Sequence, residues 1–341
     1  MADDDGWVAN VFVYMGGDQV VPRNVRFVRV HKSVKIIRPG AFRNCTILAW
    51  IEMHDGVEII GRYSFTRCRS LRQIELFGVR IIEDMAFDNC TALKYVEFGD
   101  KLEIIGKNAF NRSCLRKVKI PKVREIKCYA FSNCKQIIDV ELSEDLERIE
   151  GGAFNNCPRL RCVALPLKDN LFQTNDDQDP RVEVFYEPRI DFRPSGRGCP
   201  ELDRVDLVGG IHKTISSLHL EDWEIEMLQE IGNIKWTLHA THISEKTTVI
   251  QQWMERVLQR IEHFKLEHYA LLEKATTLLE LALWKTKLLD ETFGEVIVGT
   301  EGARTTRSQW KRARLESRQV ARVTCGADII IKNVVPFLKL E

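Results

Sequence analysis

The chain has 341 residues, of which 44% are hydrophobic and 29% are charged, a composition that excludes disorder over most of its length. Its 50 Lys and Arg residues nearly balance its 49 Asp and Glu residues, so we expect no overall attraction to nucleic acid or to an anionic membrane. The N-terminus lacks the basic start and apolar run of a secretory signal, and no uncharged apolar stretch approaches the about 18 residues of a membrane span. We therefore expect an intracellular protein, cytoplasmic or nuclear, without a membrane segment.

Residues 1–24 are predicted to form an N-terminal cap. Val11 to Tyr14 and the pair Val20-Val21 flank Gly16-Gly17-Asp18, a pattern typical of a β-hairpin. The repeats that follow need cover at their first end, and the hairpin is the predicted cover.

A Phe recurs through the next part of the chain at intervals of 23, 22, 23, 21 and 23 residues. A period of this size is typical of a solenoid, whose coils are stable only when they are stacked. The six residues are Phe42, Phe65, Phe87, Phe110, Phe131 and Phe154. Each is predicted to fill the interior of one coil.

Each coil opens with a hexamer of the pattern LxxIxL, seen most clearly in Leu71 to Leu76. Its fourth and sixth residues share one face, and its third and fifth share the other, as a strand requires. The other hexamers begin at Val25, Leu48, Leu93, Leu115, Ile137, Leu160 and Leu202. Because every strand follows a full coil, the sequence predicts a parallel sheet of about eight coils over residues 25–210.

The remainder of the unit resembles the BspA-like class of leucine-rich repeats, whose pattern combines LxxIxLP, LxxIG and AFxxC. Ala86-Phe87 and Cys90 carry the last element, and Pro121 and Pro166 stand at the proline position. The resemblance covers about residues 25–165. It implies an α/β leucine-rich-repeat solenoid, a parallel β horseshoe, and binding of a partner rather than catalysis.

The cysteines follow the repeat as well. Five of the ten fall three residues after a repeat Phe: Cys45, Cys68, Cys90, Cys134 and Cys157. We interpret them as a ladder of buried free thiols, because no second CxxC pair or His partner suggests structural zinc. The sequence also lacks GxxxxGK[ST], GxGxxG, HExxH and GxSxG. It therefore predicts no enzyme activity, metal or cofactor.

The hexamer at Leu202 begins 42 residues after the one at Leu160, about 20 more than the period. One coil is thus predicted to carry an insertion at about residues 169–198. The polar run from Asp176 to Pro180 favours an exposed loop over a finger that contacts a specific partner.

Residues 211–341 are predicted to form a helical domain. Apolar residues recur every three or four positions from Leu220 to Leu238 and from Ile250 to Leu289, which indicates two amphipathic helices joined as a hairpin at Thr241 to Ser244, with Ser244 as N-cap. The second helix is up to about 65 Å long. The first is too short to cover it, so its far half must pack on another segment or on another chain.

A basic segment occupies residues 304–322. It includes Arg307, Lys311, Arg312, Arg314 and Arg318. It can be the solvated face of a third helix, a nuclear import signal, or a contact for an acidic partner. The apolar run from Ile329 to Leu338 is expected to dock on the rest of the protein.

The third and fifth residues of each hexamer are predicted to face outward on the concave surface. Phe27, Trp50 and Tyr95 occupy third positions, and Glu52, Glu75, Glu97 and Glu141 occupy fifth positions. Exposed aromatic residues often anchor interfaces, so we predict a non-catalytic scaffold that binds a basic and apolar protein or peptide there. Alternatively, the acids only keep the sheet soluble. A second hypothesis is oligomerisation, or a nuclear or acidic-partner adaptor role, through the C-terminal helices.

Overall fold

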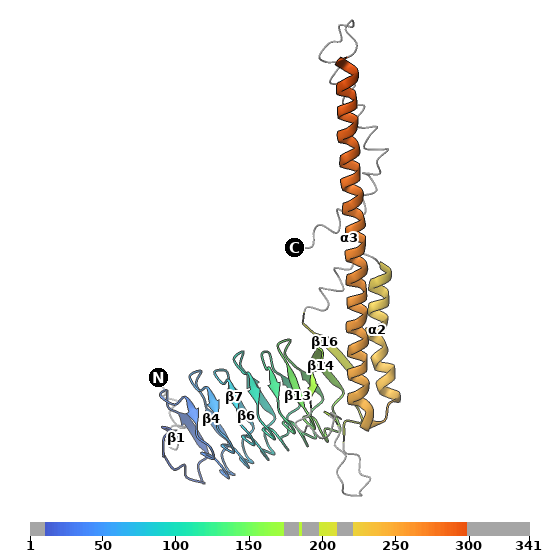
Figure 1. Cartoon of the computed structure of the whole chain (residues 1–341). Coiled ribbons are helices and arrows are strands. Elements are labelled where there is room, and N and C mark those ends of the chain that lie inside the picture. Colours follow the sequence, from blue (N-terminus) through green and yellow to red (C-terminus); the bar gives the residue numbers. More distant parts are fainter. Residues whose placement is uncertain (1–10, 174–183, 186–197, 210–220, 299–341) are drawn as a thin grey trace, which may run out of the picture. The chain divides into compact units, whose positions relative to one another are not determined.

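The structure is a computed structural model that describes residues 11–173, 184–185, 198–209 and 221–298, with side chains in the last range up to 285 (Figure 1). Its contacts divide the chain into two compact units, residues 1–212 with 228–258, and residues 213–227 with 259–341. The domain boundaries expected at residues 24 and 210 stay predictions.

The first unit is a solenoid in which each coil contributes up to two short parallel strands. The LxxIxL hexamers form β2 (Phe27–Val30), β4 (Trp50–Glu52), β6 (Gln73–Leu76), β8 (Tyr95–Phe98), β10 (Lys117–Lys119), β12 (Asp139–Glu141), β14 (Cys162–Pro166) and β16 (Arg204–Val208), and β1 (Val11–Tyr14) adds one more strand before them. We call their outward side the hexamer face. The strands lie side by side in chain order (Figure 1), with continuous ladders within β1-β2-β4, β6-β8 and β10-β12-β14-β16.

The second apolar pair of each coil forms a continuous parallel sheet. Its strands are β3 (Ile36–Ile37), β5 (Ile59–Ile60), β7 (Ile81–Ile82), β9 (Ile104–Ile105), β11 (Glu125–Ile126), β13 (Arg148–Glu150) and β15 (Phe172–Gln173). Within the described residues, seven coils thus have both strands, and β1 and β16 flank them. The predicted count of about eight coils is slightly high for complete coils.

The repeat Phe residues form the core, as predicted. All six are fully buried, and consecutive rings from Phe42 to Phe154 are 5.0 to 5.4 Å apart and within 5° of parallel. The backbone fixes this stacking, because the amide of each Phe donates to the residue that precedes the next one, as Phe65 does to the carbonyl of Ala86 at 2.8 Å. The stacked rings and this backbone hydrogen bond recur in every regular coil and add to the strand ladders that hold neighbouring coils together.

Each turn around the Phe needs two left-handed residues. Two positions after the Phe, four coils use Asn, as at Asn89 with φ 61°, because Asn tolerates this conformation best among non-Gly residues. Two positions before it, Gly40 and Gly152 have φ 69° and 66°. Gly61 and Gly106 serve another purpose. A Cβ on Gly106 would lie 2.6 Å from the amide nitrogen of Asp84, so the adjacent coil excludes a side chain there.

The cysteine ladder is confirmed for the described residues, where nine cysteines are all free. Its thiols also make a repeated hydrogen bond: Cys68 donates to the carbonyl of Phe42 at 3.1 Å, and Cys90 donates to that of Phe65 at 3.0 Å. Burial raises the pKa of these thiols, that of Cys134 to about 12. They are therefore core groups rather than nucleophiles.

The predicted N-terminal hairpin is wrong. β1 pairs in parallel with β2, in the register Val11 to Phe27, and Val20 lies 86% exposed outside any strand. The reason is the buried ring of Tyr14, which lies 5.0 Å from that of Phe42 at an angle of 59° and closes the end of the Phe stack. The parallel pairing of β1 with β2 places the Tyr14 ring against Phe42 in the core. In a local hairpin, this ring would not cover Phe42.

The predicted insertion at about 169–198 contains core residues as well as the polar run, which lies outside the described residues. Phe172 pairs through β15 with β13. Val184 and Phe185 are fully buried, and the ring of Phe185 lies 6.1 Å from that of Phe154. Phe185 thus continues the Phe stack beyond the last regular repeat.

Two helices follow, α2 (Glu221–Ala240) and α3 (Lys246–Val298), joined through the 3-10 helix η2 (Ile243–Glu245). The predicted hairpin connection is confirmed, but Ser244 lies inside η2, where the imidazole of His242 accepts from its amide. α3 has 53 residues and is therefore about 80 Å long. It is longer than predicted because the helix continues beyond Leu289. Among the described residues, no helix is long and apolar enough to cross a membrane.

The first turn of α3 covers the last coil of the solenoid. Lys246 is buried, and its Nζ donates to the carbonyl oxygens of Cys199, Pro200 and Leu202, the last at 2.5 Å. The hydroxyl of Thr247 accepts from the amide of Val184 at 3.0 Å. These contacts satisfy backbone groups that an open solenoid end would leave unpaired.

Candidate partner-binding face

The register places the predicted site residues on the hexamer face. Phe27 is opposite Trp50, Gln73 is opposite Tyr95, and Glu75 is opposite Glu97. The aromatic residues do not form one row, because Gln73 separates Trp50 from Tyr95 and no ladder joins β4 to β6. Phe27 and Trp50 are half-buried, whereas Tyr95 is 61% exposed.

Two of the four glutamates that were predicted to form an acidic stripe have their charge neutralised by an ion pair. Glu52 pairs with Arg29 at 2.5 Å, and Glu141 pairs with Lys119 at 2.9 Å, each on the adjacent strand. Lys117 pairs with Asp139 on the adjacent strand at 3.7 Å, and Arg204 pairs with Asp206 on its own strand, β16, at 3.3 Å.

Glu75 and Glu97 are the exception on this face. Among the described residues neither forms an ion pair, and both are exposed. They lie on adjacent strands about 4.8 Å apart, next to the exposed Tyr95. The negative potential of the hexamer face is therefore concentrated on β6 and β8.

Two features of this face escaped the sequence analysis. β1 adds Val11 and Val13 in register with Phe27 and Arg29, and Val13 is 41% exposed. The alternating side chains of Val11 to Tyr14 indicate a strand, but whether this strand is parallel or antiparallel depends on the strand with which it pairs. Phe77 follows β6 and is 41% exposed, which places a further aromatic ring at the end of the strand that carries Glu75.

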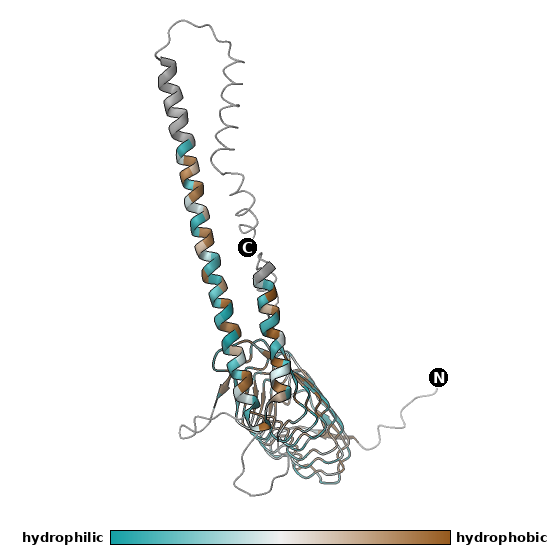
Figure 2. Cartoon of the chain, turned by 90° about the vertical axis from the view of Figure 1, so that its right-hand side faces the viewer, coloured by the Kyte–Doolittle hydropathy of each residue, from teal (hydrophilic) through white to brown (hydrophobic). Residues whose placement is uncertain are grey.

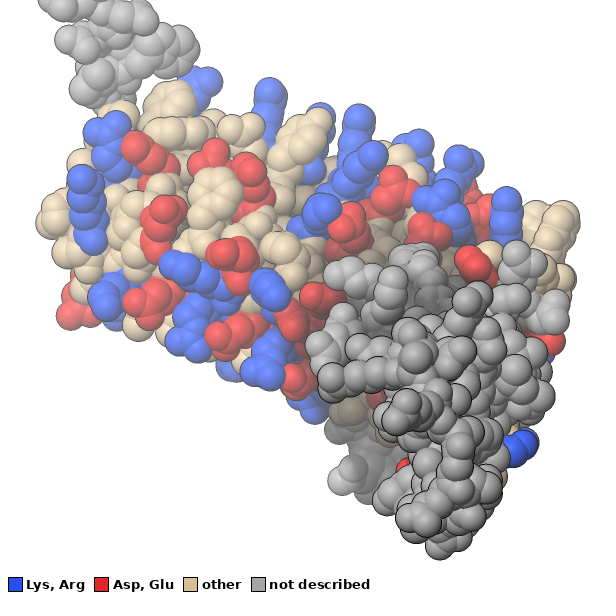
Figure 3. Space-filling model, turned by 90° about the horizontal axis from the view of Figure 1, so that it is seen from above, with Lys and Arg blue, Asp and Glu red and all other residues tan. Residues whose placement is uncertain are grey.

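Another part of the solenoid surface carries its own charge pattern. The residue before each strand of the second sheet alternates in sign over six coils, in the order Lys35, Glu58, Arg80, Glu103, Arg124, Glu147. Ion pairs of 3.5, 3.1 and 2.8 Å join them two by two. Positive and negative side chains alternate along a margin of the solenoid in Figure 3. Because these charges are matched, this surface attracts a charged partner less than β6 and β8 do.

A polar cluster lies where the hexamer face ends. The thiol of Cys162 donates to the carboxylate of Asp206 at 3.3 Å and accepts from Nε of Arg204 at 3.1 Å. Burial raises the pKa of Cys162 to about 11, so the thiol stays protonated. This protonation state disfavours a nucleophile at this position.

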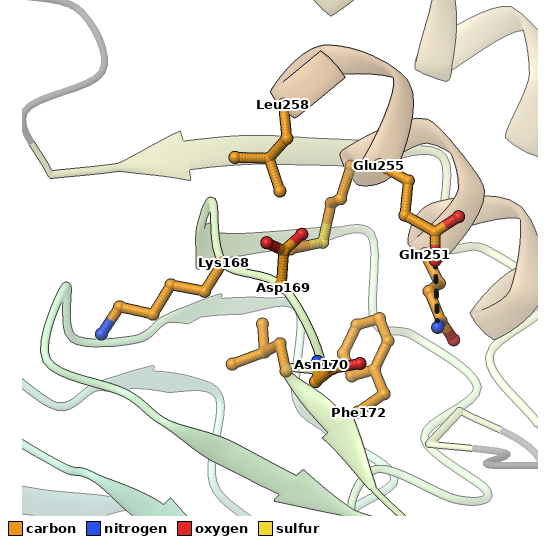
Figure 4. Close-up of a pocket in the computed structure, with 9 residues that line it drawn as sticks. Lys168, Asp169, Asn170, Phe172, Gln251, Glu255 and Leu258 are labelled. Atoms are coloured by element: carbon orange, nitrogen blue, oxygen red, sulfur yellow. Dashed lines mark hydrogen bonds between the residues drawn. The ribbon is translucent and has the colours of Figure 1, made fainter. Parts of the chain in front are cut away.

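Figure 4 shows a crevice between α3 and the loop that precedes β15, lined among others by Asp169, Phe172 and Leu258. It is barely large enough for a water molecule, so it is packing space rather than a ligand site. Within the described part of the chain, no group of His, Cys, Asp or Glu could hold a metal ion. The basic segment, with Arg307, Lys311, Arg312, Arg314 and Arg318, lies outside the described residues.

Known proteins resemble the solenoid. The BspA type leucine rich repeat family matches residues 22–122 and 77–176, in six copies. Solved structures of leucine-rich repeat proteins are similar over part of the chain. A protein from Bacteroides ovatus is 22% identical with a TM-score of 0.35, covering 55% of this chain and 61% of its own. The protein from T. pallidum is 23% identical with a TM-score of 0.36, covering 60% and 82%.

The chain thus spans about three-fifths of the first of these structures. A search of curated proteins finds no match. The family match covers the coils that contain the Phe stack, the cysteine ladder and the LxxIxL strands. Residues 22–176 of this chain therefore match the BspA type leucine-rich repeat family.

Proposed function

We propose that this protein is a non-catalytic scaffold that captures a protein or peptide partner on the hexamer face, with Tyr95, Glu75 and Glu97 at the centre of the contact. Leucine-rich repeats are in general protein-interaction scaffolds, which sets the class of function. The observation that carries the finer proposal is the charge balance of the face. Its other charged third and fifth positions form ion pairs on the face, whereas Glu75 and Glu97 form none among the described residues and lie beside an exposed ring.

The chemistry of these residues indicates the kind of partner. Two adjacent carboxylates attract Lys or Arg over about 8 Å at physiological salt, and an exposed Tyr offers apolar area with a hydroxyl that can form a hydrogen bond. A partner with a basic residue beside an apolar one fits both. Phe27 and Trp50, with the paired Glu52 and Glu141, form the flanks of this proposed contact. The proposed place of action is inside the cell, in the cytoplasm or the nucleus.

Affinity capture from native cells, followed by mass spectrometry, tests the proposal. The variant Tyr95→Ala with Glu75→Lys should lose captured proteins by at least about tenfold, because it removes the ring and reverses one carboxylate. The matched control exchanges a satisfied pair outside the hexamer face, Lys35→Glu with Glu58→Lys, and should retain them. Thermal melts check that all variants fold. Equal capture by both variants would place the interface elsewhere.

An alternative role acts through the C-terminal helices, either by self-association or as a nuclear or acidic-partner adaptor. Exposed apolar residues on α3, such as Leu278 and Trp284, favour self-association. Light scattering of the full chain over a range of concentrations tests it. A mass that stays monomeric at all concentrations would remove this alternative.

A further inference from the structure

α3 has a long apolar surface beyond its packing with α2. In the first unit Trp253 and Val257 are fully buried, and in the second unit Phe264 is 3% exposed. Past that residue, large apolar side chains become exposed. They include Leu266, Tyr269, Leu271, Leu278, Leu279, Leu281 and Trp284. Figure 2 shows hydrophobic residues interspersed with hydrophilic ones along this stretch of the helix. A surface of this extent needs cover.

The contacts between α2 and α3 show which residues face each other in an antiparallel helix pair of this chain. Within the second unit, Trp223 stacks on Phe264 at 5.1 Å and Glu226 pairs with Arg260 at 3.0 Å. Within the first, Glu230 pairs with Arg256 at 3.1 Å. The two residue numbers of each pair add up to 486 or 487, within one of twice the number of the residue at the centre of the connection, Ile243.

The chain continues for 43 residues after Val298, the end of α3. It begins with Gly299 and Gly302, residues that suit a reversal of direction. If the chain turns back there, the centre of the connection is near residue 301, and opposed residues should add up to about 602. This register brings the basic segment (304–322) beside residues 280–298 of α3.

Charge supports this register. Residues 280–298 contain four acidic and two basic residues, whereas the basic segment contains seven basic residues and one acid. The register places Arg322 opposite Glu280, which is exposed and has no ion pair among the described residues. Opposite charges on neighbouring helices stabilise the pairing modestly, and they disfavour the same helix in the reverse direction.

The distribution of hydrophobic residues supports the same register independently. In the sequence, Gly326 and the apolar run from Ile329 to Leu338 follow the basic segment. The register brings this tail to the part of α3 next to Phe264, where Leu266 and Leu271 are exposed. In this register the basic residues would face the acid-rich end of α3, and the apolar residues would face its exposed apolar part.

We propose that residues 304–338 of this chain fold back along α3 and cover its exposed apolar surface, with Arg322 next to Glu280. The occupant is the chain's own C-terminal segment rather than a second copy. This cover removes the surface on which self-association rests. It also engages the basic residues that an import receptor or an acidic partner would need, so it restricts both alternative roles.

Disulfide trapping in the full chain tests the proposal. Glu280→Cys with Arg322→Cys, in a Cys325→Ser background, should form a disulfide within one chain on mild oxidation. Peptide mass spectrometry and non-reducing gels identify the product. The matched control, Glu280→Cys with Arg304→Cys, moves the second thiol by 18 residues, about 27 Å along a helix, and should not cross-link. A disulfide between two chains, or equal trapping of both pairs, would overturn the proposal.

Hydrogen exchange of the unmodified chain gives a second measurement that needs no variant. Amides of residues 304–325 should exchange at least about tenfold more slowly than those of a synthetic peptide of the same sequence. Exchange at the rate of the free peptide would contradict the proposed cover. Protection that appears only at high protein concentration would assign the surface to a second copy, and would contradict it as well.

Discussion

The ring of Phe87 lies parallel to that of Phe110, with centroids 5.1 Å apart and planes within 4°. Both rings are fully buried, and each also stacks on a further ring on its other side. The core of the solenoid is thus a single column of rings in which every member supports two coils. Loss of one ring leaves a cavity that rigid neighbours on both sides can fill only in part.

We therefore expect Phe87→Ala to destabilise the protein by about 3–5 kcal/mol, measured by urea unfolding followed by circular dichroism. Phe77→Ala is the matched control, because Phe77 is 41% exposed only ten residues earlier, and its cost should stay below about 1 kcal/mol. Similar losses for the two variants would show that the stacked column does not dominate stability.

Lys246→Met should loosen the end of the solenoid. The substitution keeps the apolar stem but leaves three carbonyl oxygens without their donor, at a cost of about 1–3 kcal/mol. Hydrogen exchange should report it as faster exchange in residues 199–207. Lys265→Met, on an exposed position of the same helix, should leave these amides unchanged. If both variants exchange like the wild type, α3 does not cap the last coil.

Gly106→Ala and Gly232→Ala should change stability in opposite directions. A methyl group on Gly106 would meet the backbone of Glu83 and Asp84 at 2.6 Å, so destabilisation by about 1–3 kcal/mol is expected. Gly232 lies inside α2, and apart from the backbone of its own helix no atom lies within 4 Å of an added Cβ, so alanine should stabilise the helix by about 0.5–1 kcal/mol. Thermal unfolding of both variants measures these changes. A Gly106→Ala protein as stable as the wild type would show that the backbone of Glu83 and Asp84 does not exclude a side chain at residue 106.

The buried thiols predict a loss of stability at alkaline pH. The pKa of Cys134 is raised by burial from 9.0 to about 12 in the folded protein, so the unfolded chain releases this proton first as the pH rises. The contribution of the protonated Cys134 thiol to the stability of the folded protein is fully present below about pH 9 and is lost as the pH rises towards 12. Between about pH 8 and pH 10, Cys134→Ala should lose less unfolding free energy than the wild type. Equal losses would contradict the raised pKa.

The ion pair between Arg80 and Glu103 should matter little for stability. Both side chains are partly exposed, at 51% and 38%, and exposed pairs contribute about 0.2–1 kcal/mol. A double-mutant cycle with alanine at both positions should give a coupling energy in that range, and the coupling should shrink at about 1 M salt. A coupling that exceeds about 2 kcal/mol and resists salt would mean that the alternating pairs stabilise the stack in their own right.

The amino-acid sequence alone determined the solenoid, because its signal is local and repeated. Each Phe stands at the same place in its coil, so the 21 to 23 residue period by itself specifies one ring per coil and one parallel strand per hexamer. The cysteine ladder, the glycines of the turns and the helical hairpin follow from equally local patterns. The tertiary structure was needed where a residue's role depends on its partner across coils.

Three such roles escaped sequence reasoning. The direction of Val11 to Tyr14 depended on a ring that had to meet Phe42, and Phe185 joined the stack although the insertion breaks the period. Four glutamates on the hexamer face looked alike in sequence, but only cross-strand distances separated the paired Glu52 and Glu141 from the unpaired Glu75 and Glu97. Periodicity therefore sets which residues are inside, whereas the charge that the surface presents depends on which side chains reach each other.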